Sequence, residues 1–105
     1  MCYYGFMNAL TLIGNVVVVI DSNTGKRVTT LKNNAASCVS YKTFGAILLD
    51  NGDCFRYNLN NCSNMGKFGP SQKVTNINIS CNVVIFSDSK KTWRYNIENG
   101  MCIGS

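Results

Sequence analysis

Apolar positions along the chain form short runs rich in Val and Ile, separated by clusters of Asn, Asp, Ser and Gly at strand-length intervals. Such a pattern predicts antiparallel β-strands joined by tight turns. Good helix formers are scarce throughout, so we expect almost no helix. The longest apolar stretch, residues 9–20, is interrupted by Gly14 and Asn15 and is too short to span a membrane. The pattern therefore predicts an all-β chain without a membrane span.

An internal repeat organises the chain into three units. A shift of 67 residues lays residues 14–38 over residues 81–105, and a shift of 38 residues places a middle copy on the last one. Each copy carries an Asp that is followed six residues later by an Arg: Asp21 and Arg27, Asp50 and Arg56, Asp88 and Arg94. Three related units indicate a repeated supersecondary element.

Each unit is predicted to be a β-hairpin with an apolar first strand, a polar turn and a second strand. The hairpin repeats cover about residues 14–38, 43–62 and 81–105, and residues 60–74 are predicted to form a loop, all in one domain of residues 1–105. The predicted first strands are 16–20, 46–49 and 83–86, the turns are 21–25, 50–53 and 87–91, and the second strands are 26–31, 54–59 and 92–97.

The repeated Asp and Arg have a structural interpretation and a functional one. In the structural interpretation, the Asp accepts backbone N–H groups as the turn opens, and the Arg covers apolar surface and pairs with that Asp. In the functional interpretation, Arg27, Arg56 and Arg94 bind a ligand. We favour the structural interpretation, and keep the three arginines as candidate partner-binding residues.

The composition excludes most familiar enzyme chemistry. The chain has no His, which removes Ser-His-Asp triads, Cys-His dyads and His-containing zinc sites. No phosphate-binding glycine motif or calcium-loop spacing is present. We predict no catalytic residue, no metal site and no cofactor.

Six cysteines in a chain of 105 residues favour an oxidising compartment and at least one disulfide over buried free thiols. No Lys or Arg precedes Lys26, so the start of the chain lacks the basic region of a signal peptide. The expected location is therefore cytoplasmic or, with disulfides, secreted or periplasmic after removal of a signal.

The net charge of +5 brings nucleic acid into consideration. Phe55-Arg56-Tyr57-Asn58 and Trp93-Arg94-Tyr95-Asn96 place aromatic side chains beside an Arg, as in surfaces that stack on bases. Aromatic residues two positions apart in a strand are, however, usually core residues. Lys90 and Lys91 add charge to a predicted turn, where they suit an acidic protein partner at least as well as phosphate.

The predicted loop offers an apolar candidate for partner binding. Phe68 lies between Gly66 and Gly69, with Met65 nearby. Both Met65 and Phe68 are candidate partner anchors, whereas the alternative is a loop held in place by Phe68 packed in the core.

The stretch from Cys81 to Phe86, followed by a turn and Trp93, resembles one repeat of the bulb-type mannose-binding lectins, in which a Trp follows the repeat's Asn by eleven residues. The resemblance implies a β-prism of three sheets with pseudo-threefold symmetry and a Cys81–Cys102 disulfide. Its charged and phenolic sugar ligands are missing here. The positions that correspond to the sugar motif are Asn78, Ser80, Asn82, Val84 and Phe86.

Two other architectures are consistent with the repeat. Propeller-like blades would need copies of the chain to assemble into a ring, because 105 residues form only two or three blades. Another small antiparallel sandwich or barrel is the second alternative. The β-prism is the arrangement the sequence favours among the named folds.

We predict a non-enzymatic binding module that recognises a protein partner, of the inhibitor, immunity or anti-defence type, an analogy drawn from small chains without catalytic residues. Carbohydrate binding at the lectin-like strand is one alternative. Nucleic-acid binding through basic turns and aromatic strands is another, and homo-oligomerisation is compatible with all three.

Overall fold

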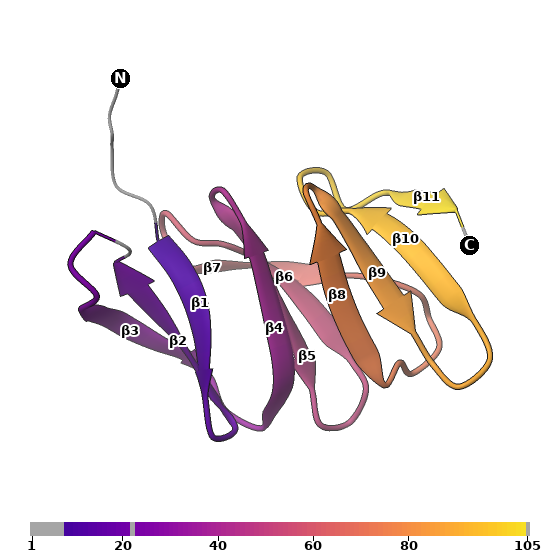
Figure 1. The fold of residues 1–105 in the computed structure, drawn as a ribbon, viewed down its shortest axis with the longest axis horizontal. Coiled ribbons are helices and arrows are strands. Elements are labelled where there is room, and N and C mark those ends of the chain that lie inside the picture. Colours follow the sequence, from indigo (N-terminus) through magenta and orange to yellow (C-terminus); the bar gives the residue numbers. More distant parts are fainter. Residues whose placement is uncertain (1–7, 22, 105) are drawn as a thin grey trace.

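The computed structural model describes residues 8–21 and 23–104, in which all regular structure is β-strand. Figure 1 shows three antiparallel sheets standing side by side in a row, in chain order. Within these residues no helix could cross a membrane. The strands are β1 (Asn8–Ile13), β2 (Val16–Asp21), β3 (Arg27–Lys32), β4 (Ala35–Tyr41), β5 (Phe44–Leu49), β6 (Cys54–Asn58), β7 (Ser63–Lys67), β8 (Asn76–Ser80), β9 (Val83–Ser87), β10 (Thr92–Asn96) and β11 (Cys102–Gly104).

Each sheet is a meander in which every strand pairs with its neighbours in the sequence. The first sheet has the order β1-β2-β3, the second β4-β5-β6-β7 and the third β11-β10-β9-β8. Two residues, Asn33 and Asn34, connect the first sheet to the second, whereas residues 68–75 connect the second to the third. Local pairing of this kind makes each sheet a nearly self-contained unit.

The three predicted hairpins are confirmed as β2-β3, β5-β6 and β9-β10. The predicted strands did not include β4, β7, β8 and β11, nor β1, although β1 lies within the longest apolar stretch. The predicted loop at 60–74 was partly wrong, since it contains β7, whose five residues are all exposed. An edge strand held by backbone bonds to β6 needs no apolar alternation, so the pattern gave no signal for it.

The second sheet is buried on both faces, which explains why the sheets stack in a row. Ile47 points toward the first sheet and Leu48 toward the third, and both are almost completely buried. In a threefold prism each sheet would turn only one face to the common core. The arrangement therefore matches the propeller-blade alternative and not the pseudo-threefold β-prism that the sequence favoured.

Aliphatic side chains dominate the interface between the first and second sheets. Val17 from β2 packs with Ile47 and Leu59 of the second sheet. Gly45 permits close approach, because a Cβ at this position would lie 2.6 Å from Leu10 Cδ1. The side chain of Asn8 donates a hydrogen bond of 2.9 Å to the Leu59 carbonyl across this interface.

Aromatic rings dominate the interface between the second and third sheets. Phe68, Phe86 and Tyr95 meet edge to face, with centroids 5.2–5.7 Å apart. These rings pack against Ala46 and Leu48. Gly69 has a φ of +107°, and a Cβ there would lie 2.7 Å from the Phe86 ring, so only glycine fits beside that ring.

The repeated Asp closes the turn in two of the three hairpins. Asp21 Oδ1 accepts the Asn23 N–H, and Asp88 Oδ1 accepts the N–H groups of Lys90 and Lys91. These backbone donors lower the pKa of Asp88. In the middle hairpin Asn51 takes this role by accepting the Asp53 N–H, so the predicted Asp function holds for the outer repeats only.

Candidate functional site

The outer face of the first sheet is an apolar surface at one end of the row. The cross-strand pairs place one set of alternate side chains of β1 and β2 on the face turned away from the second sheet, opposite to Val17 and Leu12. Ile13 and Val28 are 51% and 52% exposed. We call this surface the first outer face; it consists of Ala9, Thr11, Ile13, Val16, Val18, Ile20, Arg27 and Thr30, of which Val18 is buried, and Val28 lies beside it at a β-bulge of β3.

The outer face of the third sheet, at the other end of the row, is predominantly polar. Three cross-strand rows form it, and Val83 and Ile85 are its half-buried apolar members. We call this surface the third outer face; it consists of Asn76, Asn78, Ser80, Val83, Ile85, Ser87, Thr92, Arg94 and Asn96. The two ends of the row therefore present different chemistry to solvent.

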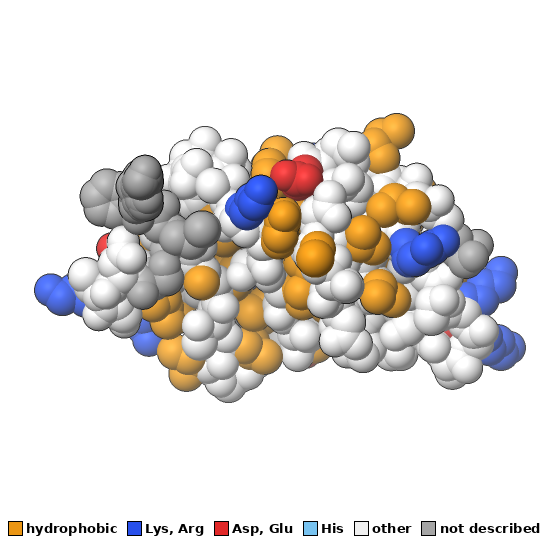
Figure 2. All heavy atoms as spheres, turned by 45° about the horizontal axis from the view of Figure 1, so that its top comes forward, with side chains coloured by type: hydrophobic (Ala, Val, Ile, Leu, Met, Phe, Trp, Pro, Cys, Tyr) orange, Lys and Arg blue, Asp and Glu red, His pale blue; other side chains and the backbone are white. Residues whose placement is uncertain are grey.

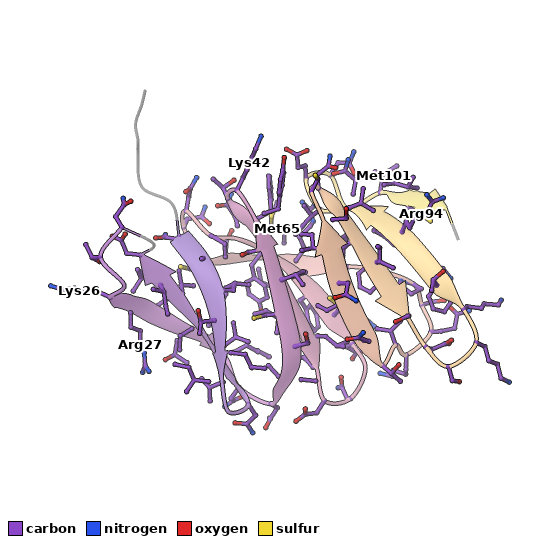
Figure 3. All side chains as sticks on the ribbon, in the orientation of Figure 1. Lys26, Arg27, Lys42, Met65, Arg94 and Met101 are labelled. Carbon is purple, nitrogen blue, oxygen red and sulfur yellow. The ribbon has the colours of Figure 1, made fainter. Side chains whose placement is uncertain are left out.

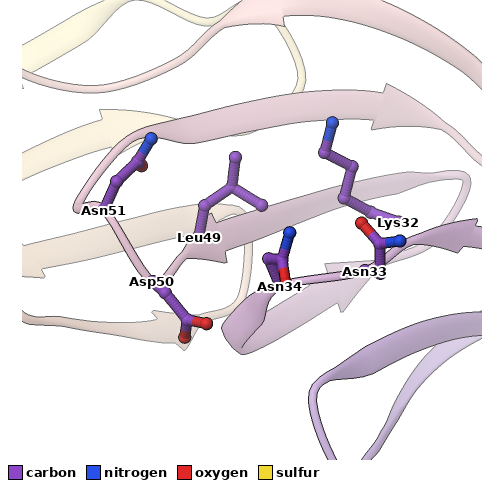
Figure 4. Close-up of a pocket in the computed structure, with 6 residues that line it drawn as sticks. All are labelled: Lys32, Asn33, Asn34, Leu49, Asp50 and Asn51. Carbon is purple, nitrogen blue, oxygen red and sulfur yellow. The ribbon is translucent and has the colours of Figure 1, made fainter.

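A polar hollow lies where the first and second sheets meet at the ends of β3 and β5 (Figure 4). Its volume is about 350 Å³, and it is lined by Lys32, Asn33, Asn34, Leu49, Asp50 and Asn51. Asn34 adopts a left-handed φ of 57°, which Asn tolerates better than most residues. The backbone N–H of Asp50 donates to the Asn34 carbonyl at 2.9 Å, which connects the turn at Asp50 and Asn51 to the link at Asn33 and Asn34.

A second hollow, of about 360 Å³, lies on the opposite side of the same Asp50–Asn51 turn, against residues 73–75. Beside this turn, Asp53 accepts a 2.7 Å hydrogen bond from the Lys73 ammonium and lies 3.4 Å from Lys67 Nζ. The Lys73 hydrogen bond is the main cause that lowers the pKa of Asp53. Because Asp53 is saturated by lysines, it offers little to a ligand.

The three repeated arginines do not converge on one site. Arg27 lies at one end of the molecule and Arg94 at the other, as Figure 3 shows. The ion pairs of the described residues involve Asp53 alone among the carboxylates, so the predicted pairing of each Arg with its repeat Asp is wrong. Asp21 and Asp88 instead accept backbone N–H groups of their own turns.

Arg56 is a structural link between the second and third sheets. Its Nη1 donates to the carbonyl oxygens of Ile97 and Glu98, each at 3.1 Å. The guanidinium also lies 5.9 Å from the centroid of the Phe44 ring. These contacts leave Arg56 poorly placed to bind a partner.

The basic residues are spread over the surface. On the face visible in Figure 2, Lys and Arg side chains lie at both ends and near the middle of the molecule. Lys90 and Lys91 are exposed in the β9–β10 turn. The aromatic residues of the two tetrapeptides contribute to the cores between sheets, so they do not form a stacking surface beside these charges.

The two apolar candidates of the predicted loop have opposite environments. Met65, on β7, is 41% exposed and remains available to a partner. Phe68 is only 5% exposed, because it packs edge to face on Phe86 and Tyr95. The prediction that Phe68 anchors a partner was therefore wrong, and its alternative, a loop held in place by the core, is what the structure shows.

The lectin-like positions are divided between the surface and the core. Asn78 and Ser80 are exposed, whereas Asn82 is half-buried and its amide donates to Glu98 Oε1 at 3.1 Å. Val84 and Phe86 are completely buried. Strand alternation turns these two residues toward the second sheet, so they cannot contact a ligand on the outer side.

The five described cysteines are free thiols, including Cys81 and Cys102. Cys81 follows β8, whereas Cys102 begins β11, and β9 and β10 lie between these strands. At about 4.8 Å per strand, this separation exceeds the Cα distance that a disulfide can span. The bridge implied by the lectin resemblance is therefore not formed.

Neither the first outer face nor the polar hollow was predictable from the sequence. The sequence predicts residues 16–20 as the apolar first strand of a hairpin, but β2 is apolar on both sides, so its pattern does not indicate which side stays open. Asn33 and Asn34 lie outside the predicted turns. Their adjacency to the Asp50 turn depends on the packing of two sheets.

No protein-family model matches the chain, and no curated protein matches it. Solved structures do match in fold. The N-terminal domain of Nup159 aligns with a TM-score of 0.67 and 16% identity over 99% of this chain and 28% of that one. The computationally designed Ika8 protein aligns with a TM-score of 0.65 and 11% identity over 98% of this chain and 34% of that one.

Hsv2 from Kluyveromyces lactis aligns with a TM-score of 0.64 and 9% identity over 94% of this chain and 32% of that one. The chain thus spans about a third of the length of these structures. Nup159 and Hsv2 are β-propeller-like, so the likeness establishes the fold as a row of propeller-type blades.

Proposed function

We propose that the chain is a non-enzymatic protein-binding module that engages its partner through the first outer face. The observation that carries this proposal is the exposure of Ile13, on a face composed of Ala, Thr, Val and Ile apart from Arg27, together with the exposure of Val28 at the β-bulge of β3 in the same sheet. Binding of a partner protein to an apolar sheet face is favourable, because water is then released from the apolar side chains.

The contrast with the other end of the row supports the assignment. Terminal repeats of stacked architectures usually carry a polar outer face that ends the stack. The third outer face has this character, with Asn76, Asn78 and Arg94 exposed. The first outer face lacks it, which makes it the end where a partner would continue the packing.

The fold is compatible with a role in protein assemblies. One structural neighbour, with a TM-score of 0.64 and 16% identity over 90% of this chain and 32% of that one, belongs to the mitotic checkpoint complex. A specific inhibitor of the immunity or anti-defence type remains the finer hypothesis for this chain.

Site-directed photocrosslinking tests the proposal. Benzoylphenylalanine in place of Val28 is expected to give one discrete protein adduct in extracts of cells that express the chain. The same probe in place of Ile103 is the matched control, because Ile103 is equally exposed but lies on β11 of the third sheet. We expect no corresponding adduct from position 103.

Competition makes the result specific. Excess unmodified chain should abolish the adduct, whereas a chain carrying Ile13→Asn and Val28→Asn should not compete. Equal adducts from positions 28 and 103, or equal competition by both chains, would contradict a partner site on the first outer face.

The polar hollow favours a second candidate function, the binding of a small polar ligand such as a glycan. Amide groups of Asn33, Asn34 and Asn51 supply donors and acceptors together, as sugar hydroxyls require. Glycan-array binding that is lost on Asn33→Ala but kept on Asn78→Ala would assign it to this hollow. Loss on Asn78→Ala alone would instead support the lectin-like strand.

A further inference from the structure

The first sheet lacks the fourth strand that completes the other two sheets. The second and third sheets continue from β6 to β7 and from β10 to β11, whereas β3 has no further strand among the described residues. Only Asn33 and Asn34 separate β3 from β4, so the connection contains no residues for a fourth strand. The outer edge of β3 therefore presents backbone N–H and C=O groups that no described strand pairs.

The fourth strands of the other sheets show how little burial this position requires. All five residues of β7 are exposed, and β11 is only three residues long. Both pair antiparallel with their neighbours, so backbone hydrogen bonds provide most of their attachment. A short extended peptide could be held beside β3 in the same way.

The charges around β3 select the chemistry of such a peptide. The strand begins with Arg27, ends with Lys32 and follows Lys26, and it contains no acidic residue. The ion pairs of the described residues join only Asp53 to Lys67 and Lys73, so these three cations have no such partner. Between the charges, Val28 offers an exposed aliphatic side chain on the same strand.

A second copy of the chain fits this edge poorly. Antiparallel pairing of two β3 strands in register would place Arg27 of each copy opposite Lys32 of the other. Like charges directly opposite one another destabilise a strand pair. The edge thus favours a strand of the opposite charge.

We propose that the edge of β3 binds an extended acidic segment of the partner protein, which adds to the first sheet as its fourth strand. This inference rests on the proposed protein-binding function and names the recognition mode as β-strand addition. The backbone of β3 supplies the hydrogen bonds, Arg27 and Lys32 attract carboxylates at the two ends of the segment, and Val28 contacts an aliphatic side chain between them.

Fluorescence polarisation with a labelled peptide, Asp-Val-Thr-Val-Thr-Glu-amide, tests this on the full chain. Two control peptides isolate the two contributions: one replaces Asp and Glu by Asn and Gln, and the other carries N-methyl groups on alternate backbone amides. We expect each control peptide to bind at least tenfold more weakly than the acidic probe. Affinity for the acidic probe should also fall as salt is raised, because the contacts are between exposed charges.

Charge reversal in the protein gives the complementary test. Arg27→Glu with Lys32→Glu should weaken probe binding at least tenfold. Lys90→Glu with Lys91→Glu changes the net charge equally at the far end of the molecule and should alter binding less than twofold. Arg27→Gln with Lys32→Gln serves as a milder variant, should the reversed chain lose its circular dichroism signature.

Absence of probe binding, or equal binding of the N-methylated peptide, would overturn strand addition. Protection from hydrogen exchange, in the free monomer, of those amides of residues 27–32 that do not bond to β2 would assign the edge to the chain's own residues. A concentration-dependent dimer that disappears on Lys32→Glu would assign it to a second copy. If photocrosslinking at position 28 still succeeds after any of these results, the protein-binding function stands and only the strand-addition mode fails.

Discussion

The first and third sheets flank the same central sheet, yet they attach to it by different chemistry. Aliphatic contacts around Val17, one side-chain hydrogen bond from Asn8 and a backbone hydrogen bond of 2.8 Å from the Ala35 N–H to the Asn15 carbonyl hold the first sheet. An aromatic cluster around Phe86 and two bonds from the Arg56 guanidinium hold the third. Directional side-chain contacts therefore dominate the attachment of the third sheet, whereas aliphatic packing and backbone hydrogen bonds dominate that of the first.

The two sheets also differ in what they expose. The third sheet ends the row with a polar face, whereas the first sheet presents an apolar face and a strand edge without a described neighbour. Related hairpins can thus form a polar end of the row in one sheet and an apolar end in another. The difference lies in a few alternate side chains, because strand alternation sends odd and even residues to opposite faces.

The largest expected effect comes from the aromatic core of the third sheet. Phe86→Ala removes a completely buried ring that contacts Phe68 and Tyr95, and should lower the free energy of unfolding by about 3–5 kcal/mol. Urea denaturation followed by circular dichroism measures this loss. Val17→Ala, with a smaller buried side chain in the first interface, should cost clearly less. An equal cost for both would remove the proposed contrast between the interfaces.

Loss of a side-chain hydrogen bond between sheets should likewise reduce the free energy of unfolding more at the third sheet than at the first. Arg56→Ala removes two charge-assisted bonds to carbonyl groups and should cost about 1–2 kcal/mol of unfolding free energy, whereas Asn8→Ala removes one neutral bond and should cost about 1 kcal/mol or less. Urea titrations of both variants under identical conditions decide the order. A larger loss from Asn8→Ala would reverse our view of which sheet is held more firmly.

Alkaline pH should weaken the interface between the second and third sheets more than the interface between the first and second sheets. Burial raises the pKa of Cys54 from 9.0 to about 12, and it also raises the pKa of Cys38, which packs toward the first sheet. Folding therefore favours the protonated thiols, and their contribution is complete below about pH 9 and is lost as the pH rises toward 12.

The measurement is the urea midpoint between pH 8 and 12 for the unmodified chain, Cys54→Ala and Cys38→Ala. The alkaline decline should flatten most in Cys54→Ala. Cys81→Ala, which removes an exposed thiol, should leave the decline unchanged. Equal flattening in Cys38→Ala and Cys54→Ala would indicate that both interfaces respond alike.

The smallest effect on stability is expected at the first outer face. Ile13→Asn and Val28→Asn replace half-exposed side chains and should each change the free energy of unfolding by about 0.5 kcal/mol or less. The same variants should reduce the fluorescence of a bound hydrophobic dye, and Ile103→Asn should reduce it less. A large loss of stability would instead show that this face is already covered within the chain.

The repeat made most of the local structure predictable. Three hairpins, their turns and the Asx-type closures at Asp21 and Asp88 follow from short-range patterns of apolar and turn residues. The remaining strands escaped prediction because their stability depends on neighbours already in the sheet. Exposed β7, without a single buried side chain, is the clearest example.

The candidate site was much less predictable. Arg56 and Phe68 were candidates for partner binding, but both contribute to the junction with the third sheet. Val84 and Phe86 follow a lectin-like pattern, but their side chains face the core. A residue's type indicates which chemistry it can perform, whereas the packing of sheets decides whether solvent or a partner can reach it.

The sequence by itself determined that this protein is all-β, that it is built from three related hairpins and that the turns of the two outer hairpins close on Asp side chains. These properties depend on contacts between residues close in the chain. Only the tertiary structure decided that the sheets stand in a row, that Cys81 and Cys102 stay apart, and that one end is apolar and the other polar. The row and the contrast between its ends arise because both faces of the second sheet must be buried, which leaves the two outer faces of its neighbours to meet solvent, whereas Cys81 and Cys102 stay apart because β9 and β10 lie between them.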